Sequence, residues 1–135
     1  MANQFLEKRT QIFTYDVTGG DSGAIGAHTL GTLPANAVIT QAWIHVLTTF
    51  TDGADDSATI SLGYTGALTA FEAATAISTG TTWDAAAPRV SDAAADGAVG
   101  NFVTAAAGDS IIATVADDAL DAGKLLLVVE YYIAD

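Results

Sequence analysis

Apolar and polar residues alternate along much of this chain, which is the pattern expected of β-strands that bury one face. The longest alternating run covers residues 38–51. One of its faces is apolar and is expected to join the core: Ala42, Ile44, Val46 and Phe50. The other face is mixed: Gln41, Trp43, His45, Leu47 and Thr49. A polar turn follows at residues 52–57 and residues 58–62 resume the pattern, which predicts two strands joined by a turn.

Other segments also show strand patterns. They cover residues 10–18, 27–32, 89–91, 99–105, 110–116 and 124–134. The last of these is apolar on both faces, with Leu125, Leu127 and Val129 opposite Leu126 and Val128. We expect it to be a central strand of a sheet, covered on both sides.

Residues 67–77, ALTAFEAATAI, contain good helix formers and predict one or two helical turns. The chain otherwise has seven to nine predicted strands, separated by turn residues and without alternating helices. This favours an all-β fold, an antiparallel jelly-roll-like sandwich or barrel. Residues 1–9 fit neither pattern and are interpreted as an N-terminal arm. Residues 10–135 are then long enough to form a single β domain.

The charge of the chain excludes some partners. Sixteen acidic residues face only four basic ones, and the formal net charge is -12. Such a protein is expected to repel nucleic acid and anionic membranes. There is no cysteine, so disulfides and thiolate chemistry are impossible. No segment has the pattern of a secretion signal or a membrane span.

Two acidic turns could offer oxygen ligands to Ca²⁺, and their carboxylates are Asp52, Asp55 and Asp56 in the first and Asp117, Asp118 and Asp121 in the second. Hard cations prefer several oxygens gathered in one loop. The first turn lacks the spacing and the glutamate of an EF-hand, and Asp and Gly are also the residues that tight turns use. We therefore interpret both as solvated turns and expect no metal.

No catalytic or cofactor motif stands out. The two histidines, His28 and His45, lie in predicted strands without a second ligand at metal-binding spacing. The chain has no G-x-S-x-G elbow, no phosphate-binding loop and no dinucleotide fingerprint. Carboxylate pairs of the glycosidase kind stay open, although nearly all acids fall in predicted turns. We expect no enzyme activity and no cofactor.

The irregular stretch from 78 to 97 contains Trp83 and Arg89. Both residue types are enriched in binding hot spots, so they are candidates for a protein contact. A loop tryptophan can equally plug the core, and both interpretations of Trp83 stay open here.

Four segments together resemble capsid decoration (cement) proteins of tailed bacteriophages: LPANAVITQAWIHVLTTF, SATISLGY, ALTAFEAAT and DAGKLLLVVEYYI. The resemblance covers residues 33–75 and 110–133. It implies a structural protein that is assembled in the host cytoplasm, binds the major capsid protein on the outside of an icosahedral head, and forms a homotrimer. It also implies that the terminal arm reaches the lattice or a neighbouring protomer, with Phe5 and Leu6 as anchors.

The residues that we expect at a capsid or protomer interface are Phe5, Leu6, Trp43, His45, Leu47, Trp83 and Arg89. Two alternatives stay open. A glycan- or host-binding module of a head or tail fibre would need exposed aromatic residues, and the candidates are Trp43, Tyr64, Trp83 and Tyr132. A glycan hydrolase would need a cleft that holds a carboxylate with a raised pKa.

Overall fold

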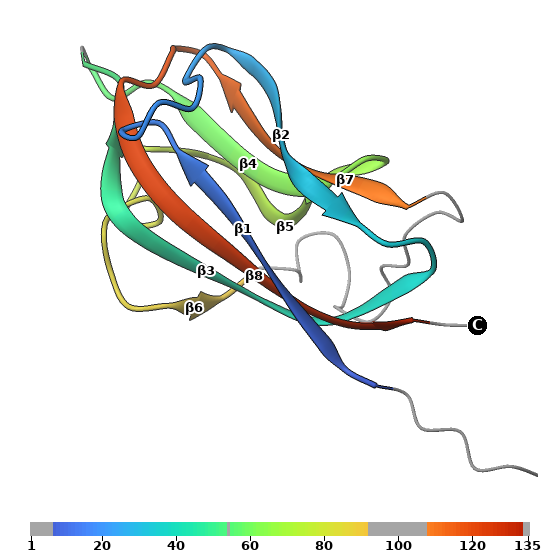
Figure 1. Ribbon diagram of the computed structural model, residues 1–135. Helices are drawn as coiled ribbons and strands as arrows, with labels where there is room; N and C mark the ends of the chain where they lie inside the picture. Colours follow the sequence, from blue (N-terminus) through green and yellow to red (C-terminus); the bar gives the residue numbers. More distant parts are fainter. Residues whose placement is uncertain (1–6, 54, 92–107, 134–135) are drawn as a thin grey trace, which may run out of the picture.

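The computed structural model describes residues 7–53, 55–91 and 108–133, and these form two facing four-stranded sheets (Figure 1). The first sheet has the order β1-β8-β3-β6, made of β1 (Arg9–Asp16), β8 (Ala122–Ile133), β3 (Ala37–Thr51) and β6 (Arg89–Val90). The second has the order β2-β7-β4-β5, made of β2 (Gly26–Leu33), β7 (Asp109–Ala116), β4 (Thr59–Tyr64) and β5 (Ala67–Ala76). The predicted all-β sandwich is confirmed.

The strands pair as in a long hairpin that is rolled up into two sheets. β1 pairs with β8, β2 with β7, β3 with β6 and β4 with β5, all antiparallel. Two further antiparallel pairs, β3 with β8 and β4 with β7, complete the sheets. This is a jelly-roll-like arrangement, in which the strands nearest the two chain ends lie side by side. The first and last described strands therefore belong to one sheet.

The core forms where the inward faces of the two sheets meet. Leu125, Leu127 and Val129 of β8 are completely buried, as the alternation predicts. The predicted core face of β3 is buried as well: Ala42, Ile44, Val46 and Phe50. A shift of register between Ile39 and Gln41 reverses the parity of β3, so Ile39 is buried together with Ala42.

The segment 67–77 is strand β5, and the prediction of helical turns there was wrong. No helix occurs in the described part of the chain, and hence none that could cross a membrane. The helix-forming preference of Ala, Leu and Glu is worth only tenths of a kcal/mol per residue, about 0–0.7. Pairing with β4 and complete burial of Ala70 and Phe71 outweigh it.

The remaining predicted strands divide into two groups. Those at 10–18, 27–32, 89–91, 110–116 and 124–134 are confirmed within one or two residues at most ends. The strand predicted at 99–105 lies outside the described residues, as do Phe5 and Leu6 of the N-terminal arm.

Three loops meet at one end of the sandwich (Figure 1). The amide of Leu120 donates to the carbonyl of Gly23 at 2.7 Å, and the amide of Asp121 donates to the carbonyl of Thr51 at 2.9 Å. These bonds join the β1–β2, β3–β4 and β7–β8 connections. Seven carboxylates lie in the three loops, without a lysine or arginine among them: Asp21, Asp52, Asp55, Asp56, Asp117, Asp118 and Asp121. We call this region the acidic end.

Gly63 is required where β5 crosses close to β4. A Cβ at this position would lie 2.2 Å from the carbonyl oxygen of Ala67 and 2.3 Å from the carbonyl carbon of Leu68. Because these are backbone atoms of a paired strand, they cannot move aside. We expect Gly63→Ala to lower the free energy of unfolding by about 1–3 kcal/mol, measured by urea denaturation.

The matched control is Ser61→Ala, on the same strand. Ser61 is also buried, but this change adds no volume and is expected to cost less. An unfolding midpoint of Gly63→Ala equal to that of the wild type would contradict the close approach.

Candidate interaction surface

The outward face of the first sheet carries a row of apolar side chains across all four strands. Ile12 of β1 pairs with Val128 of β8, Val128 pairs with Trp43 of β3, and Trp43 pairs with Val90 of β6. Directly opposite residues of antiparallel strands point to the same face. Beside this row, Leu126 of β8 pairs with His45 of β3. We call this surface the apolar face, and its large apolar residues are Ile12, Trp43, Leu47, Val90, Leu126 and Val128.

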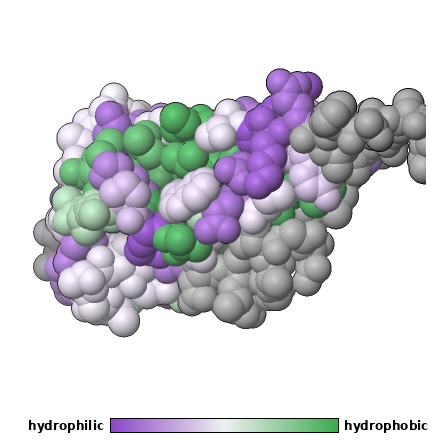
Figure 2. Space-filling model, turned by 90° about the horizontal axis from the view of Figure 1, so that it is seen from below, coloured by the Kyte–Doolittle hydropathy of each residue, from purple (hydrophilic) through white to green (hydrophobic). Residues whose placement is uncertain are grey.

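Among the described residues, most of the exposed large apolar side chains lie on the apolar face. Five large apolar side chains are exposed among the described residues: Ile12 (59%), Ile25 (60%), Leu47 (40%), Leu68 (43%) and Val90 (56%). Three of the five, Ile12, Leu47 and Val90, belong to it. Figure 2 looks from the side where β3 and β6 lie in Figure 1 and shows green apolar side chains gathered there, bordered by purple polar ones. A contiguous patch of this kind typically marks a binding surface.

The charges on the apolar face are already paired. Lys8 Nζ lies 3.3 Å from Glu130 Oε1, and Lys124 Nζ lies 3.6 Å from Asp16 Oδ2. Each pair joins β8 to β1 or to the residue just before it, one on either side of the apolar row. Two acids and two bases cancel, so this face is locally neutral on a chain with a net charge of -12. Surface ion pairs add little stability, about 0–1 kcal/mol each.

The outward face of the second sheet has a different composition. Its central row runs from Ala27 of β2 through Thr114 of β7 to Ser61 of β4. The next row pairs Thr29 with Ile112 and Ile112 with Gly63. Small and hydroxyl-bearing residues dominate these two rows, in which Ala27 and Thr29 are exposed whereas Ser61 and Gly63 are buried. The two sides of the sandwich are therefore chemically distinct.

Trp83 lies in the core and has an exposed fraction of only 1%. Its indole N–H donates to the carbonyl of Thr75 at 3.0 Å, and its ring meets Phe50 edge-on at 6.2 Å between centroids. The loop that carries it closes over one edge of the sandwich. Trp83 is thus a plug of the core, the alternative that the sequence left open, and it offers no surface to a partner.

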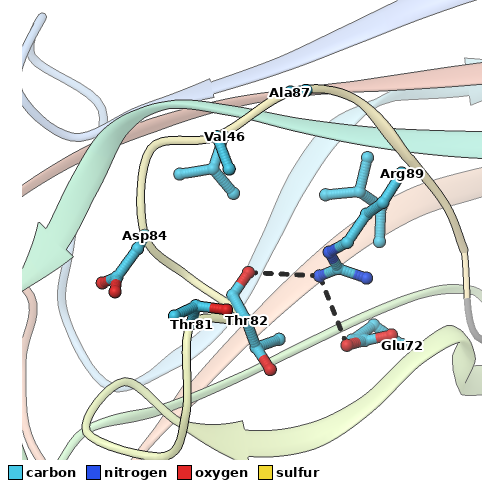
Figure 3. A pocket seen from close by; sticks show the side chains of 9 residues that line it. Val46, Glu72, Thr81, Thr82, Asp84, Ala87 and Arg89 are labelled. Atoms are coloured by element: carbon cyan, nitrogen blue, oxygen red, sulfur yellow. Dashed lines mark hydrogen bonds and ion pairs between the residues drawn. The ribbon is translucent and has the colours of Figure 1, made fainter.

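Arg89 points into a pocket of about 440 Å³ between β3, β5 and the loop before β6 (Figure 3). Its Nη2 donates to the carbonyl of Thr82 at 3.2 Å and lies 3.3 Å from Glu72 Oε1. The guanidinium carbon also lies 5.8 Å from the ring centroid of Trp83. One cation thus links β6, β5 and the loop. Val90, its neighbour, is the β6 residue on the apolar face.

The two acidic turns come together at the acidic end. One carboxylate oxygen from each of Asp52, Asp55 and Asp118 lies within 4.8 Å of the others. The Asp52 carboxylate accepts hydrogen bonds from the amides of Asp56 at 2.8 Å and Ala58 at 3.0 Å. These bonds organise the β3–β4 turn, which is an ordinary role for aspartate in a turn. The sequence places Asp118 in a separate turn, so this grouping depends on the fold.

Two tyrosine hydroxyls have altered acidity. Burial, together with the charge of Asp21, raises the pKa of Tyr15 well above its ordinary value, and its hydroxyl donates to the carbonyl of Ser22 at 2.8 Å. Burial and the charge of Asp109 also raise the pKa of Tyr64. Both phenols stay protonated at neutral pH and have structural roles.

The four aromatic residues that a glycan platform would use are not fully exposed. Trp83 and Tyr64 are buried, and Trp43 and Tyr132 are half-buried on the outward side of the first sheet. Of the two histidines, His45 lies on the apolar face, and His28 stacks on Tyr15 at 5.7 Å between centroids.

Comparison with solved structures finds the same fold along nearly the whole chain. A chain of the cyanophage Pam1 capsid asymmetric unit matches 99% of this protein and 91% of its own length, with a TM-score of 0.64 and 16% identity. The fold is one found in a phage capsid. A chain of the capsid of Ralstonia phage GP4 matches 96% of this protein and 86% of its own length, with a TM-score of 0.64 and 19% identity.

A third match is a chain of the acidic stable capsid of Helicobacter pylori bacteriophage KHP30. It covers 97% of this protein and 95% of its own length, with a TM-score of 0.57 and 13% identity. No protein-family model and no curated protein sequence matches this chain. At these identities the likeness establishes the shared fold. The shared fold extends over 96 to 99% of this chain.

Sequence reasoning placed Trp43, His45 and Leu47 together but missed their neighbours Ile12, Val90 and Val128. The signal was present in the sequence, because Ile12 and Val128 lie on the strand faces opposite to the expected core residues. We expected β8 to be covered on both faces. In the single chain its outward side chains Leu126 and Val128 are only half-buried, because no element of the described chain packs over them.

We expect Arg89→Met to lower the free energy of unfolding by about 1–3 kcal/mol, because it removes the cation beside Glu72, whose exposed fraction is only 7%. The double variant Arg89→Met, Glu72→Gln should lose less than the sum of the two single variants, since it removes both charges together. Urea denaturation of the four proteins measures this coupling. Additive losses would contradict the ion pair.

Proposed function

We propose that this protein is a decoration protein of a phage head. It binds the outer surface of the icosahedral shell, contacts the major capsid protein and stabilises the lattice, as a homotrimer. The observation that carries the proposal is the end-to-end match of its fold to chains of phage capsids, at TM-scores of 0.57 to 0.64. The sequence resemblance to decoration proteins points in the same direction.

The extent of the match supports an accessory role. The alignments cover 86 to 95% of the matched chains, so those chains are about as short as this one. A short chain folded as one sandwich suits a component that is added to a shell from outside. Among the described residues, 25 apolar side chains from both sheets and the loops are buried in its own core, so it can fold before it binds.

The charge supports the outer surface. A protein that faces packaged DNA needs basic residues to neutralise phosphates. This chain carries 16 acidic and four basic residues. Three of the four, Lys8, Arg89 and Lys124, are engaged in ion pairs within the chain. An acidic surface is repelled by DNA and suits the outside of the head.

Multivalent attachment explains how such a small protein can strengthen a shell. A trimer that touches several capsid subunits gains avidity, because the second and third contacts form at a high effective concentration. Each contact resists separation of the subunits that it bridges. The internal pressure of packaged DNA is then shared across the clamped positions.

Binding to heads that lack this protein tests the proposal. We expect saturable binding of the purified protein to expanded heads, in multiples of three copies per lattice unit, and greater resistance of the decorated heads to heating. Co-sedimentation and electron microscopy measure the two effects. Failure to bind any expanded head would refute the proposal.

We further propose that the N-terminal arm contributes to attachment through Phe5 and Leu6. Deletion of residues 1–6 retains Lys8 and its ion pair with Glu130. The truncated protein should keep the thermal unfolding midpoint of the wild type and bind heads at least tenfold more weakly. The double variant Phe5→Ser, Leu6→Ser should match it. Equal head binding by the truncated and full-length proteins would exclude the arm.

A further inference from the structure

We infer that copies of this chain associate through the apolar face, so that Ile12, Trp43 and Val90 are buried against another copy. The inference deepens the trimer of the proposed function by naming the surface that the copies share. It commits to one occupant, a second copy of this chain, and its argument rests on the exposure, the charge and the register of the described residues.

The apolar face exposes large apolar side chains whose burial against a partner would be favourable. Ile12 and Val90 end a row that also contains Val128 and Trp43. A sheet with one solvated side normally alternates apolar residues inward with polar residues outward. β8 breaks this rule, because both of its faces are apolar. The second sheet has small or hydroxyl-bearing residues, Ala27, Thr114 and Ser61, in its central row, and Ser61 is already buried within the chain. Among the described residues, three of the five exposed large apolar side chains, Ile12, Leu47 and Val90, lie on this outward side of the first sheet, so covering it removes apolar surface from water.

The charge of the chain identifies the occupant. Two copies that each carry a net charge of -12 repel one another. The repulsion is strongest at the acidic end, where seven carboxylates lie without a basic residue in the same loops. The apolar face is neutral, because the Lys8–Glu130 and Lys124–Asp16 pairs cancel. Copies that meet through this face bring no net charge into contact.

The pairing of those charges also favours self-association. A face built to bind a partner of opposite charge presents unmatched charges of one sign. Here both ion pairs are closed within the chain, on either side of the apolar row. The face is thus compatible with another copy of the same acidic protein. It has no electrostatic feature that selects a basic partner.

Ile12→Asp is the critical variant, and Ile25→Asp is its matched control. The two isoleucines are equally exposed, at 59% and 60%, but Ile25 precedes β2 and lies outside the apolar face. Both variants add the same charge. We expect wild type and Ile25→Asp to form the same trimer in analytical ultracentrifugation, whereas Ile12→Asp should need at least tenfold higher protein concentration to associate. Val90→Asp should behave like Ile12→Asp.

Thermal unfolding shows whether each variant is folded. If Ile12→Asp is not folded, the milder variant Ile12→Thr replaces it in the association measurement. A wild-type protein that is monomeric at every concentration would overturn the inference, as would an Ile12→Asp protein that associates like the wild type. If Ile12→Asp stays trimeric but loses head binding, the face contacts the capsid and the inference is wrong while the proposed function stands. If the variants dissociate as expected but the wild type binds no head, only the proposed function fails.

Discussion

The fold depends on the hydrogen bonding of β8 between β1 and β3. This strand is antiparallel to both neighbours along most of its length, and it supplies the buried residues Leu125, Leu127 and Val129. Its register also decides what lies outside, because pairing places Ile12 and Trp43 on either side of Val128. One strand thus fixes the centre of the core and the centre of the apolar face. A shift by one residue would exchange the two.

The strands could largely be predicted from the sequence, because alternation directly reports one buried face. Three features could not. The helix prediction at 67–77 failed because local propensity is weaker than pairing with β4. The outward positions of Ile12 and Val128 follow from the alternation, but their alignment with Trp43 and Val90 in one row depends on the order and register of β1, β8, β3 and β6. The grouping of Asp52 with Asp118 was missed because two loops far apart in sequence meet only in the folded chain.

Charge and apolar area are unevenly distributed over the surface of this small protein. Carboxylates gather in the loops at the acidic end, while the outward side of the first sheet is apolar and neutral. The loop with Trp83 is held by Arg89, whose guanidinium reaches both Glu72 and the carbonyl of Thr82. Arg89 and Trp83 thus stabilise the edge next to the apolar face. This arrangement suits a component that meets its own copies on one side and leaves its acidic loops free.

The central claim is that copies of this protein sit on the outside of a phage head and meet through the apolar face. The most direct test is a near-atomic reconstruction of heads that carry the protein. The account predicts density for three copies on the outer surface, with Ile12, Trp43 and Val90 of each buried against a neighbouring copy. Density inside the shell, or outer copies whose apolar faces are open to solvent, would contradict it.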